Sequence, residues 1–227
     1  MTAAGPLPPY AQFFDFMSES DQSRLLDWAL SNAGRFKPAT VTKGRIDSKG
    51  RLDPESRIAL TTRELASVEP LVRQPLLDVL DDAIARTGTG GSRPTSLELE
   101  IAAHGDGAHF APHLDIPIGA KRKPLASEPG FDRIISAVYY FYAEPRAFSG
   151  GSLRLYRFGC EPQENGADAN NYVDIEPVQN SLVVFPSWAT HEVRRVSCPS
   201  GDFRDYRFAL NCWYCRPLNP LPAQKAK

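Results

Sequence analysis

The second half of the chain consists of short apolar or alternating runs separated by turn-forming residues. The runs cover residues 97–103, 134–142, 152–158, 172–175, 181–185, 191–196 and 206–214. Gly, Pro, Asn and Asp stand between them, and these residues favour turns through their backbone conformations or local hydrogen bonds. Many short runs with such punctuation are typical of strands that pair into a β-sandwich or jelly roll. The sequence therefore predicts a β core over this half of the chain.

The first 95 residues combine helical patterns with short strand-like pieces. Ser18 and Asp21 offer N-cap chemistry before a helical pattern at residues 24–30. A second helix is predicted over residues 68–86, with apolar residues on one face and Gly88 at its end. Strand-like pieces occur at residues 39–42 and 57–62. We predict a mainly β protein with flanking helices (α+β), in which N-terminal helices pack on the outside of a jelly-roll core.

No linker-like stretch divides the chain, and 227 residues suit one domain of generous size. We therefore expect a single domain over residues 1–227. Within it, residues 1–95 form the helical and strand support, and residues 96–216 form the β core. Residues 217–227 are rich in Pro, Ala and Lys and are expected to be a frayed tail.

The composition argues against two kinds of partner. The formal net charge is -1, so no basic surplus points to nucleic acid. No stretch approaches the roughly 20 apolar residues of a membrane helix. Residues 1–17 lack the basic start and long apolar run of a secretory signal. We expect a cytoplasmic protein that binds neither nucleic acid nor membranes, and nothing in the sequence predicts its oligomeric state.

The four cysteines are expected to be reduced thiols. They are Cys160, Cys198, Cys212 and Cys215, and the last two have CxxC spacing. That pair lies inside an apolar strand-like run, and no second cysteine pair has zinc-site spacing. We therefore favour buried thiols over a metal or redox site.

The histidines suggest chemistry. Three of the four lie within ten residues of one another, beside an acid, in His104-Gly-Asp-Gly-Ala-His-Phe-Ala-Pro-His-Leu-Asp115. Side chains two residues apart in an extended chain point the same way, so His113 and Asp115 can reach one point. His191, at the start of a later strand, would complete a set of two histidines and one carboxylate. This set binds Fe(II) on one face and leaves three coordination positions open.

Four segments in this order resemble the prolyl-hydroxylase-like branch of the 2-oxoglutarate oxygenases. Residues 105–115 look like the family's approach to its His-x-Asp motif, and residues 135–141 are similar to its next core strand. Residues 149–154 resemble its Gly-Gly strand entry, and residues 185–213 resemble its closing segment. The resemblance spans about half the chain, and the N-terminal part matches only loosely, as helical support.

The resemblance implies a double-stranded β-helix with an iron site at its mouth, held by His113, Asp115 and His191. It implies that 2-oxoglutarate chelates Fe(II) through its keto and C1 carboxylate oxygens, and that O2 takes the last position. Oxidative decarboxylation would then yield succinate and CO2, with ascorbate as an accessory reductant. Related halogenases lack the carboxylate ligand, so Asp115 favours hydroxylation or another oxidation.

Arg207 is the predicted anchor for the C5 carboxylate of 2-oxoglutarate, because a guanidinium matches a carboxylate with two parallel hydrogen bonds. It lies sixteen residues after His191, where relatives place the basic residue about nine to twelve after. An inserted turn at residues 198–202 would absorb the difference. Arg204 is nearer to the usual distance, but Arg207 stands six residues before Trp213, the register that relatives use.

Three further residues are candidates for contact with 2-oxoglutarate. Tyr140 matches the family's core-strand tyrosine, although a core aromatic role is nearly as common. His104 occupies a position where relatives often carry tyrosine, and a structural histidine is an equal alternative. Asn211 shares strand parity with the predicted arginine anchor and would face the same pocket. His109 shares strand parity with His113, and would line the substrate mouth or be exposed.

The sequence thus predicts a hydroxylase that attacks an unactivated C–H bond. The substrate would be a peptidyl residue such as proline, or a small amino-acid-like or natural-product molecule, because the loops rather than the fold determine it. Residues 116–132 form a long loop after Asp115 that is either a lid or a solvated basic turn. The competing hypothesis is a non-catalytic or differently catalytic cupin-type protein that holds a metal or ligand.

Overall fold

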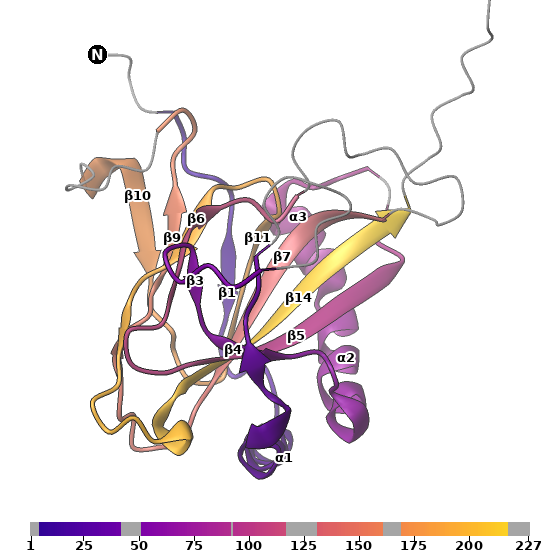
Figure 1. Cartoon of the computed structure of the whole chain (residues 1–227). Helices are drawn as coiled ribbons and strands as arrows, with labels where there is room; N and C mark the ends of the chain where they lie inside the picture. Colours follow the sequence, from indigo (N-terminus) through magenta and orange to yellow (C-terminus); the bar gives the residue numbers. More distant parts are fainter. Residues whose placement is uncertain (1–4, 42–50, 92, 117–130, 161–168, 218–227) are drawn as a thin grey trace, which may run out of the picture.

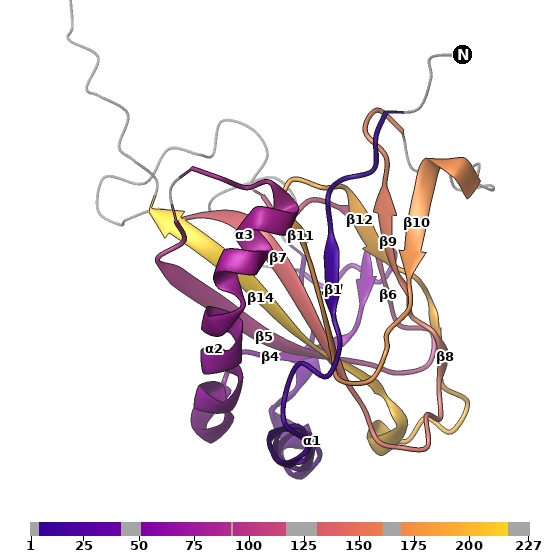
Figure 2. The same ribbon diagram turned by 180° about the vertical axis from the view of Figure 1, so that it is seen from behind.

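Two facing β-sheets form the centre of the molecule, and helices cover the outer face of the larger sheet (Figures 1 and 2). The computed structural model describes residues 5–41, 51–91, 93–116, 131–160 and 169–217. The predicted mainly β architecture with flanking helices is confirmed. The first sheet has seven strands and the second has five, and a short two-stranded pair accompanies them.

Neighbouring strands in all three sheets run antiparallel. The large sheet has the spatial order β1 (Ala11–Phe13), β11 (Ser181–Pro186), β7 (Phe131–Phe141), β14 (Arg207–Pro217), β5 (Ser96–His104), β4 (Leu60–Thr62) and β2 (Lys37–Pro38). The small sheet has the order β10 (Tyr172–Ile175), β9 (Leu153–Tyr156), β12 (His191–Val193), β6 (His109–His113) and β3 (Arg57–Ile58). The separate pair is β8 (Ser149–Gly150) with β13 (Val196–Ser197).

Side chains alternate between two different environments along the central strand β14. Phe208, Leu210, Cys212 and Tyr214 belong to the core between the large sheet and the helices. The intervening side chains, Arg207, Ala209, Asn211 and Trp213, line a cavity between the two sheets. This is the period of two expected for a β-strand, and it places polar groups where a site can form.

The N-terminal helices begin and end largely as predicted. Helix α1 (Glu19–Ser31) is capped by Ser18, whose hydroxyl accepts a hydrogen bond of 3.1 Å from the Asp21 amide. The helix predicted over residues 68–86 is instead two helices, α2 (Glu69–Asp78) and α3 (Leu80–Thr87). They meet at Val79, where ψ is -3°. Gly88 ends α3 with a left-handed φ of 63°, as the sequence predicts.

Two predicted strands are divided between sheets. The run at residues 57–62 gives β3 in the small sheet and β4 in the large sheet, and the run at residues 191–196 gives β12 and β13. The strand predicted at residues 39–42 begins earlier, as β2, and continues only as a bridge between Val41 and Arg51. Thr42 lies outside the described residues. A chain that changes sheet in mid-run gives no break in hydrophobic pattern, so the sequence did not reveal these divisions.

The cysteines form no disulfide, as predicted. All four are free, and Cys198, Cys212 and Cys215 are buried. Burial raises the pKa of Cys215 to about 12, so this thiol stays protonated and unreactive at neutral pH. Cys160 is half-buried.

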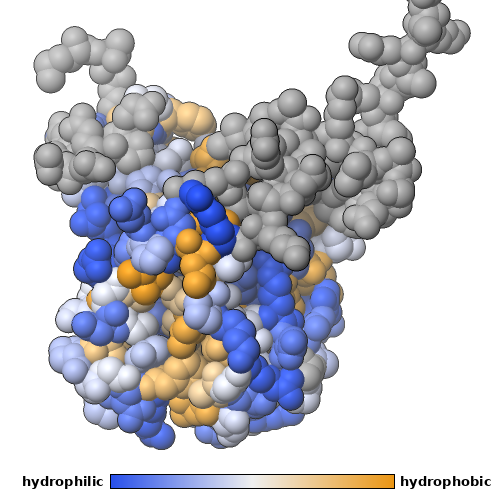
Figure 3. Space-filling view, viewed as in Figure 1, coloured by the Kyte–Doolittle hydropathy of each residue, from blue (hydrophilic) through white to orange (hydrophobic). Residues whose placement is uncertain are grey.

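The molecular surface mixes charged and apolar residues, and an apolar strip runs down the middle of the face in Figure 3. None of the helices in the described segments has the length and apolar character needed to cross a membrane.

Asn180 ties the segment before α1 to the large sheet. Its amide nitrogen donates to the carbonyl of Met17 (2.8 Å), and its amide oxygen accepts from the Met17 amide (2.9 Å) and the Tyr139 hydroxyl (3.0 Å). Its φ is 54°, a conformation that asparagine tolerates better than most residues. The three hydrogen bonds are buried, so all of them are protected from competition with water.

We expect Asn180→Ala to lower the free energy of unfolding by roughly 3 kcal/mol, because it leaves buried groups without partners and places alanine at positive φ. Urea denaturation measures the change. The matched control is Asn32→Ala, which removes one half-buried hydrogen bond to Trp28 and should cost about 1 kcal/mol or less. Equal effects of the two substitutions would contradict the anchoring role.

Candidate metal centre and cosubstrate pocket

Strands β6 and β12 bring the predicted metal ligands together. His113 is the last residue of β6 and pairs with His191, the first residue of β12. Asp115 follows two residues after His113, and its amide donates to the carbonyl of Ser187 (3.1 Å) in the turn before β12. This hydrogen bond joins the turn to the segment after β6. The side chains of His113, Asp115 and His191 therefore converge on one point.

Both imidazoles present the same nitrogen to the carboxylate. His113 Nδ1 lies 2.8 Å from the carbonyl oxygen of Ala111, and His191 Nδ1 lies 2.9 Å from that of Ala189. A carbonyl only accepts, so each Nδ1 carries a proton, and Nε2 is the nitrogen that each neutral ring would offer to a metal ion. The two Nε2 atoms lie 3.7 and 3.6 Å from the carboxylate oxygens of Asp115, too far for direct hydrogen bonds. The three side chains offer ligand atoms within 4.8 Å of one another and could hold one metal ion.

The electrostatics suit a metal ion. Burial lowers the pKa of His113 to about 3, and the neighbouring His191 acts in the same direction, so His113 is neutral at pH 7. Burial acts to raise the pKa of Asp115, but the two histidines and hydrogen bonds from Ser136 and Trp213 lower it overall. The Ser136 hydroxyl donates to Asp115 Oδ2 at 2.6 Å. Two imidazoles and one carboxylate are the donor set that suits Fe(II).

A β-bulge in β6 decides which of its side chains face the centre. His191 pairs with His113 but Val193 pairs with Phe110, so β6 has one extra residue between these pairs. The extra residue turns Phe110 to the side of His113, and their rings stack with centroids 3.6 Å apart. His109 instead approaches backbone carbonyl oxygens and does not line the cavity. The prediction that His109 shares the parity of His113 is wrong, because the bulge reverses it.

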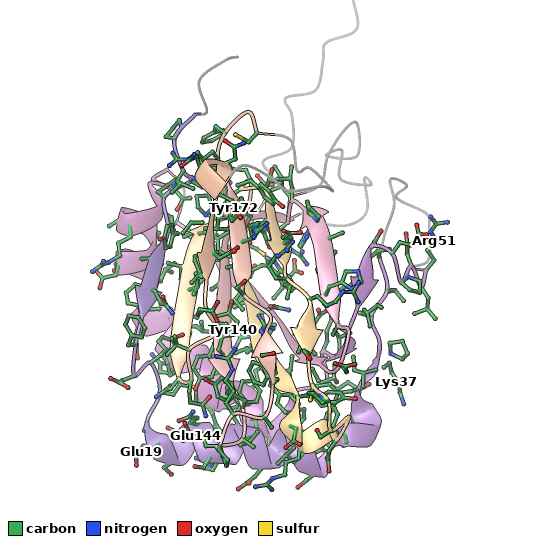
Figure 4. The ribbon with its side chains drawn as sticks, turned by 90° about the vertical axis from the view of Figure 1, so that its left-hand side faces the viewer. Glu19, Lys37, Arg51, Tyr140, Glu144 and Tyr172 are labelled. Atoms are coloured by element: carbon green, nitrogen blue, oxygen red, sulfur yellow. The ribbon has the colours of Figure 1, made fainter. Side chains whose placement is uncertain are left out.

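Arg207 lines the same cavity, with 1% of its surface exposed. Its Nη1 donates to His104 Nδ1 at 3.1 Å, and its guanidinium carbon lies 4.8 Å from the centroid of the Tyr140 ring. Arg207 Nε and the Tyr140 hydroxyl are buried without a hydrogen-bond partner among the described residues. Figure 4 shows Tyr140 among the strands in the middle of the molecule. Buried donors without partners are rare, so they suit an acidic ligand.

His104 is held neutral beside this arginine. Burial lowers its pKa well below the usual value, and the charge of Arg207 acts in the same direction. A guanidinium can only donate, so His104 Nδ1 accepts and Nε2 carries the proton. Gly151 leaves room for this arrangement: its φ is 73°, and a Cβ there would lie 2.6 Å from Arg207 Cδ.

The structure places all seven predicted site residues around one cavity. They are His104, His113, Asp115, Tyr140, His191, Arg207 and Asn211. Arg204 is exposed in a short 3-10 helix, Phe203–Asp205, and does not line the cavity. Sequence reasoning missed Arg57, Phe110 and Ser136. Ser136 could have been found from its parity with Tyr140 on one strand, but Arg57 comes from a distant strand of the other sheet.

Comparison with known proteins identifies the family. A model of the 2OG-Fe(II) oxygenase superfamily matches residues 99–215, more than half of the chain. The chain belongs to this superfamily. The cofactors of such an oxygenase are Fe(II), 2-oxoglutarate and O2, so the predicted cofactors are confirmed, and the predicted class of enzyme is confirmed with them.

A relative with a similar sequence is an uncharacterised PKHD-type hydroxylase of Synechocystis sp. (strain PCC 6803). It is 29% identical over 212 residues, which cover 92% of this chain and 64% of the relative. The chain therefore spans less than two thirds of that relative's length.

Solved structures with the same fold include three prolyl hydroxylases. The enzyme of Trichoplax adhaerens, in complex with a peptide of hypoxia inducible factor, is 19% identical with a TM-score of 0.60, covering 91% of this chain and 83% of that one. A Pseudomonas putida prolyl-4-hydroxylase is 20% identical with a TM-score of 0.57 and 92% coverage of both chains. A collagen prolyl hydroxylase of Paramecium bursaria Chlorella virus-1 is 14% identical with a TM-score of 0.55, covering 91% and 95%. At these identities the likeness shows the fold, a double-stranded β-helix.

Each of the substitutions His113→Ala, Asp115→Ala and His191→Ala should weaken Fe(II) binding by more than the ~10–100-fold that loss of an outer-shell partner costs. Anaerobic calorimetric titration with Fe(II) measures this, and circular dichroism checks that the fold persists. Ser136→Ala, which removes the hydrogen bond to Asp115, should have the smaller outer-shell effect, and His109→Ala should have none. Near-wild-type affinity in all three ligand variants would show that the metal binds elsewhere.

Proposed function

We propose that this chain is an Fe(II)- and 2-oxoglutarate-dependent hydroxylase that oxidises an unactivated C–H bond and releases succinate and CO2. His113, Asp115 and His191 would hold the iron, and Arg207 would bind the C5 carboxylate of 2-oxoglutarate. The observation that carries the proposal is the convergence of both Nε2 atoms on Asp115, in a cavity that is also lined by the buried guanidinium of Arg207, whose Nε has no partner among the described residues.

The residues of the cavity have separable tasks. The bound iron and 2-oxoglutarate would supply the oxidising chemistry, and the protein orients and shields them. Arg207 offers parallel N–H donors to a carboxylate, and neutral His104 keeps the guanidinium in place by accepting one of its hydrogen bonds. The Tyr140 hydroxyl is a further buried donor next to Arg207. Asn211 lines the same wall and would contact the cosubstrate or a bound water.

The primary substrate would enter through a cleft that adjoins the metal centre. This cleft has a volume of about 660 Å³ and is lined by His113, Asp115, Phe110, Arg133 and Trp213, among others. The lining combines the aromatic rings of Phe110 and Trp213 with several charged side chains, and fixed polar groups of this kind orient a bound ligand. The names of the relatives support a peptidyl substrate such as proline, and a small amino-acid-like or natural-product molecule is the second candidate.

The long loop after Asp115 remains a predicted lid or basic turn, because residues 117–130 lie outside the described residues. Ascorbate likewise remains a predicted reductant.

The proposal is tested by incubating the protein with Fe(II), 2-oxoglutarate and O2 and following succinate by chromatography. We expect slow succinate formation in the absence of substrate and faster formation in the presence of one. Succinate should be absent when iron is removed with a chelator. A protein that binds Fe(II) but never forms succinate would support the cupin-type alternative instead.

Arg207→Ala should raise the KM for 2-oxoglutarate at least about tenfold, since a hydrogen bond to a charged group contributes roughly 1.5–3 kcal/mol. Succinate formation over a range of 2-oxoglutarate concentrations measures the change. The matched control is Arg204→Ala, which removes an exposed guanidinium on the same connection and should leave KM unchanged. The reverse pattern would move the anchor to Arg204.

A further inference from the structure

A chain of alternating charges lines one wall of the cleft beside the metal centre. Glu100 binds Arg57 (2.8 Å) and Arg63 (3.1 Å), and Glu98 binds Arg133 and lies 3.6 Å from Arg63. These side chains come from β3, from the segment after β4, and from β5 and β7, which flank β14 in the large sheet. All five line the same cleft as His113 and Asp115.

Positive charge exceeds negative charge in this wall. Three guanidinium groups face two carboxylates, which leaves a net charge of +1. In the proposed function the metal centre is balanced by itself, because Fe(II), Asp115, Arg207 and the 2-oxoglutarate dianion sum to zero. The surplus of the wall is therefore not cancelled by the bound cosubstrate. A net positive charge beside low-dielectric walls favours a ligand of negative charge.

Arg57 is the member of the wall nearest to the chemistry. Its guanidinium lies 4.7 Å from the ring of Phe110, which itself stacks on His113. Arg57 lines both the metal cavity and the cleft, whereas Arg63 lines only the cleft. Its side chain is 11% exposed, against 56% for Arg63.

The donors of Arg57 are only partly used. A guanidinium has five N–H donors. Arg57 Nη2 binds Glu100, while its Nε is buried without a partner among the described residues. A guanidinium fixed by a carboxylate on one side and an aromatic ring on its face is preorganised to bind an acceptor. The acceptor that uses its geometry and charge best is a second carboxylate.

We propose that the primary substrate presents a free carboxylate to Arg57, and so is a small amino-acid-like carboxylic acid rather than an internal residue of a peptide. This inference rests on the proposed function, since it assumes that the cleft beside the metal is the substrate cleft. It selects the second of the two substrate classes proposed above, a small acid, over the peptidyl substrate that the names of the relatives support. The cleft would therefore select substrates by their negative charge.

The test compares N-acetyl-L-proline with N-acetyl-L-prolinamide, which have nearly the same shape and differ in charge. The protein is loaded with Fe(II) and saturating 2-oxoglutarate without O2, and ligand-observed NMR gives the affinity of each probe. We expect the acid to bind at least about tenfold more tightly than the amide, the effect of one charged hydrogen bond. Arg57→Gln should abolish the preference, and Arg57→Lys should keep part of it.

Arg63→Gln is the matched control. It also removes an ion pair with Glu100, but at the exposed end of the wall, so the preference for the acid should persist. Equal binding of the two probes, tighter binding of the amide, or no binding of either would overturn the proposal. So would an equal loss of preference in Arg57→Gln and Arg63→Gln. Succinate formation by the wild-type protein is measured in parallel, because its absence would refute the proposed function itself.

Discussion

The register of β14 between β5 and β7 is the constraint on which the rest of the structure depends. Residues 207–215 of β14 pair with β5, and β7 pairs along its other edge. One face of the three strands carries the apolar side chains that α2 and α3 cover, and the other carries Arg207, His104 and Tyr140. A slip of one residue would exchange the two faces and put a guanidinium into the helix core. The burial of the outer face therefore determines the position of the site.

The helices contribute to the site through this register, without touching it. The Tyr214 hydroxyl, on the outer face of β14, donates to the carbonyl of Leu76 in α2 at 2.7 Å. Leu76 itself is fully buried in the core between the helices and the sheet. Fixing the outer face of β14 also fixes the inner one, because alternate side chains share one backbone. The N-terminal helices thus help to position Arg207, although the sequence of this N-terminal part resembles the family only loosely.

Sequence reasoning succeeded where the strand is regular and failed where it is not. Parity along β14 predicted that Arg207, Asn211 and Trp213 share a face, and they do. The same rule failed for His109, because the β6 bulge adds a residue that no pattern in the sequence marks. The helix over residues 68–86 was predicted as one piece because apolar residues recur on both sides of Val79.

Contacts between strands that are distant in sequence could not be predicted for a different reason. Arg57 and Glu100 are 43 residues apart and lie in different sheets. Their pairing depends on how the run at residues 57–62 divides between the sheets, and periodicity gives no sign of this division. The metal ligands were found because two of them are close in sequence and the third begins a strand after a turn.

The buried guanidinium of Arg207, whose Nε has no hydrogen-bond partner among the described residues, connects cosubstrate binding with the stability of the fold. Burial lowers the pKa of this arginine, which means that the fold makes its charged form less favourable than water does. His104 accepts one hydrogen bond and the Tyr140 ring faces the cation, but neither carries a negative charge. A dicarboxylate that neutralises the guanidinium removes this cost only in the folded state. Binding of the cosubstrate then stabilises the fold by RT ln(1 + [L]/Kd), about 2.7 kcal/mol at a hundredfold excess over Kd. The free-energy cost of burying the charge of Arg207 is therefore offset by the same ligand that the proposed reaction requires.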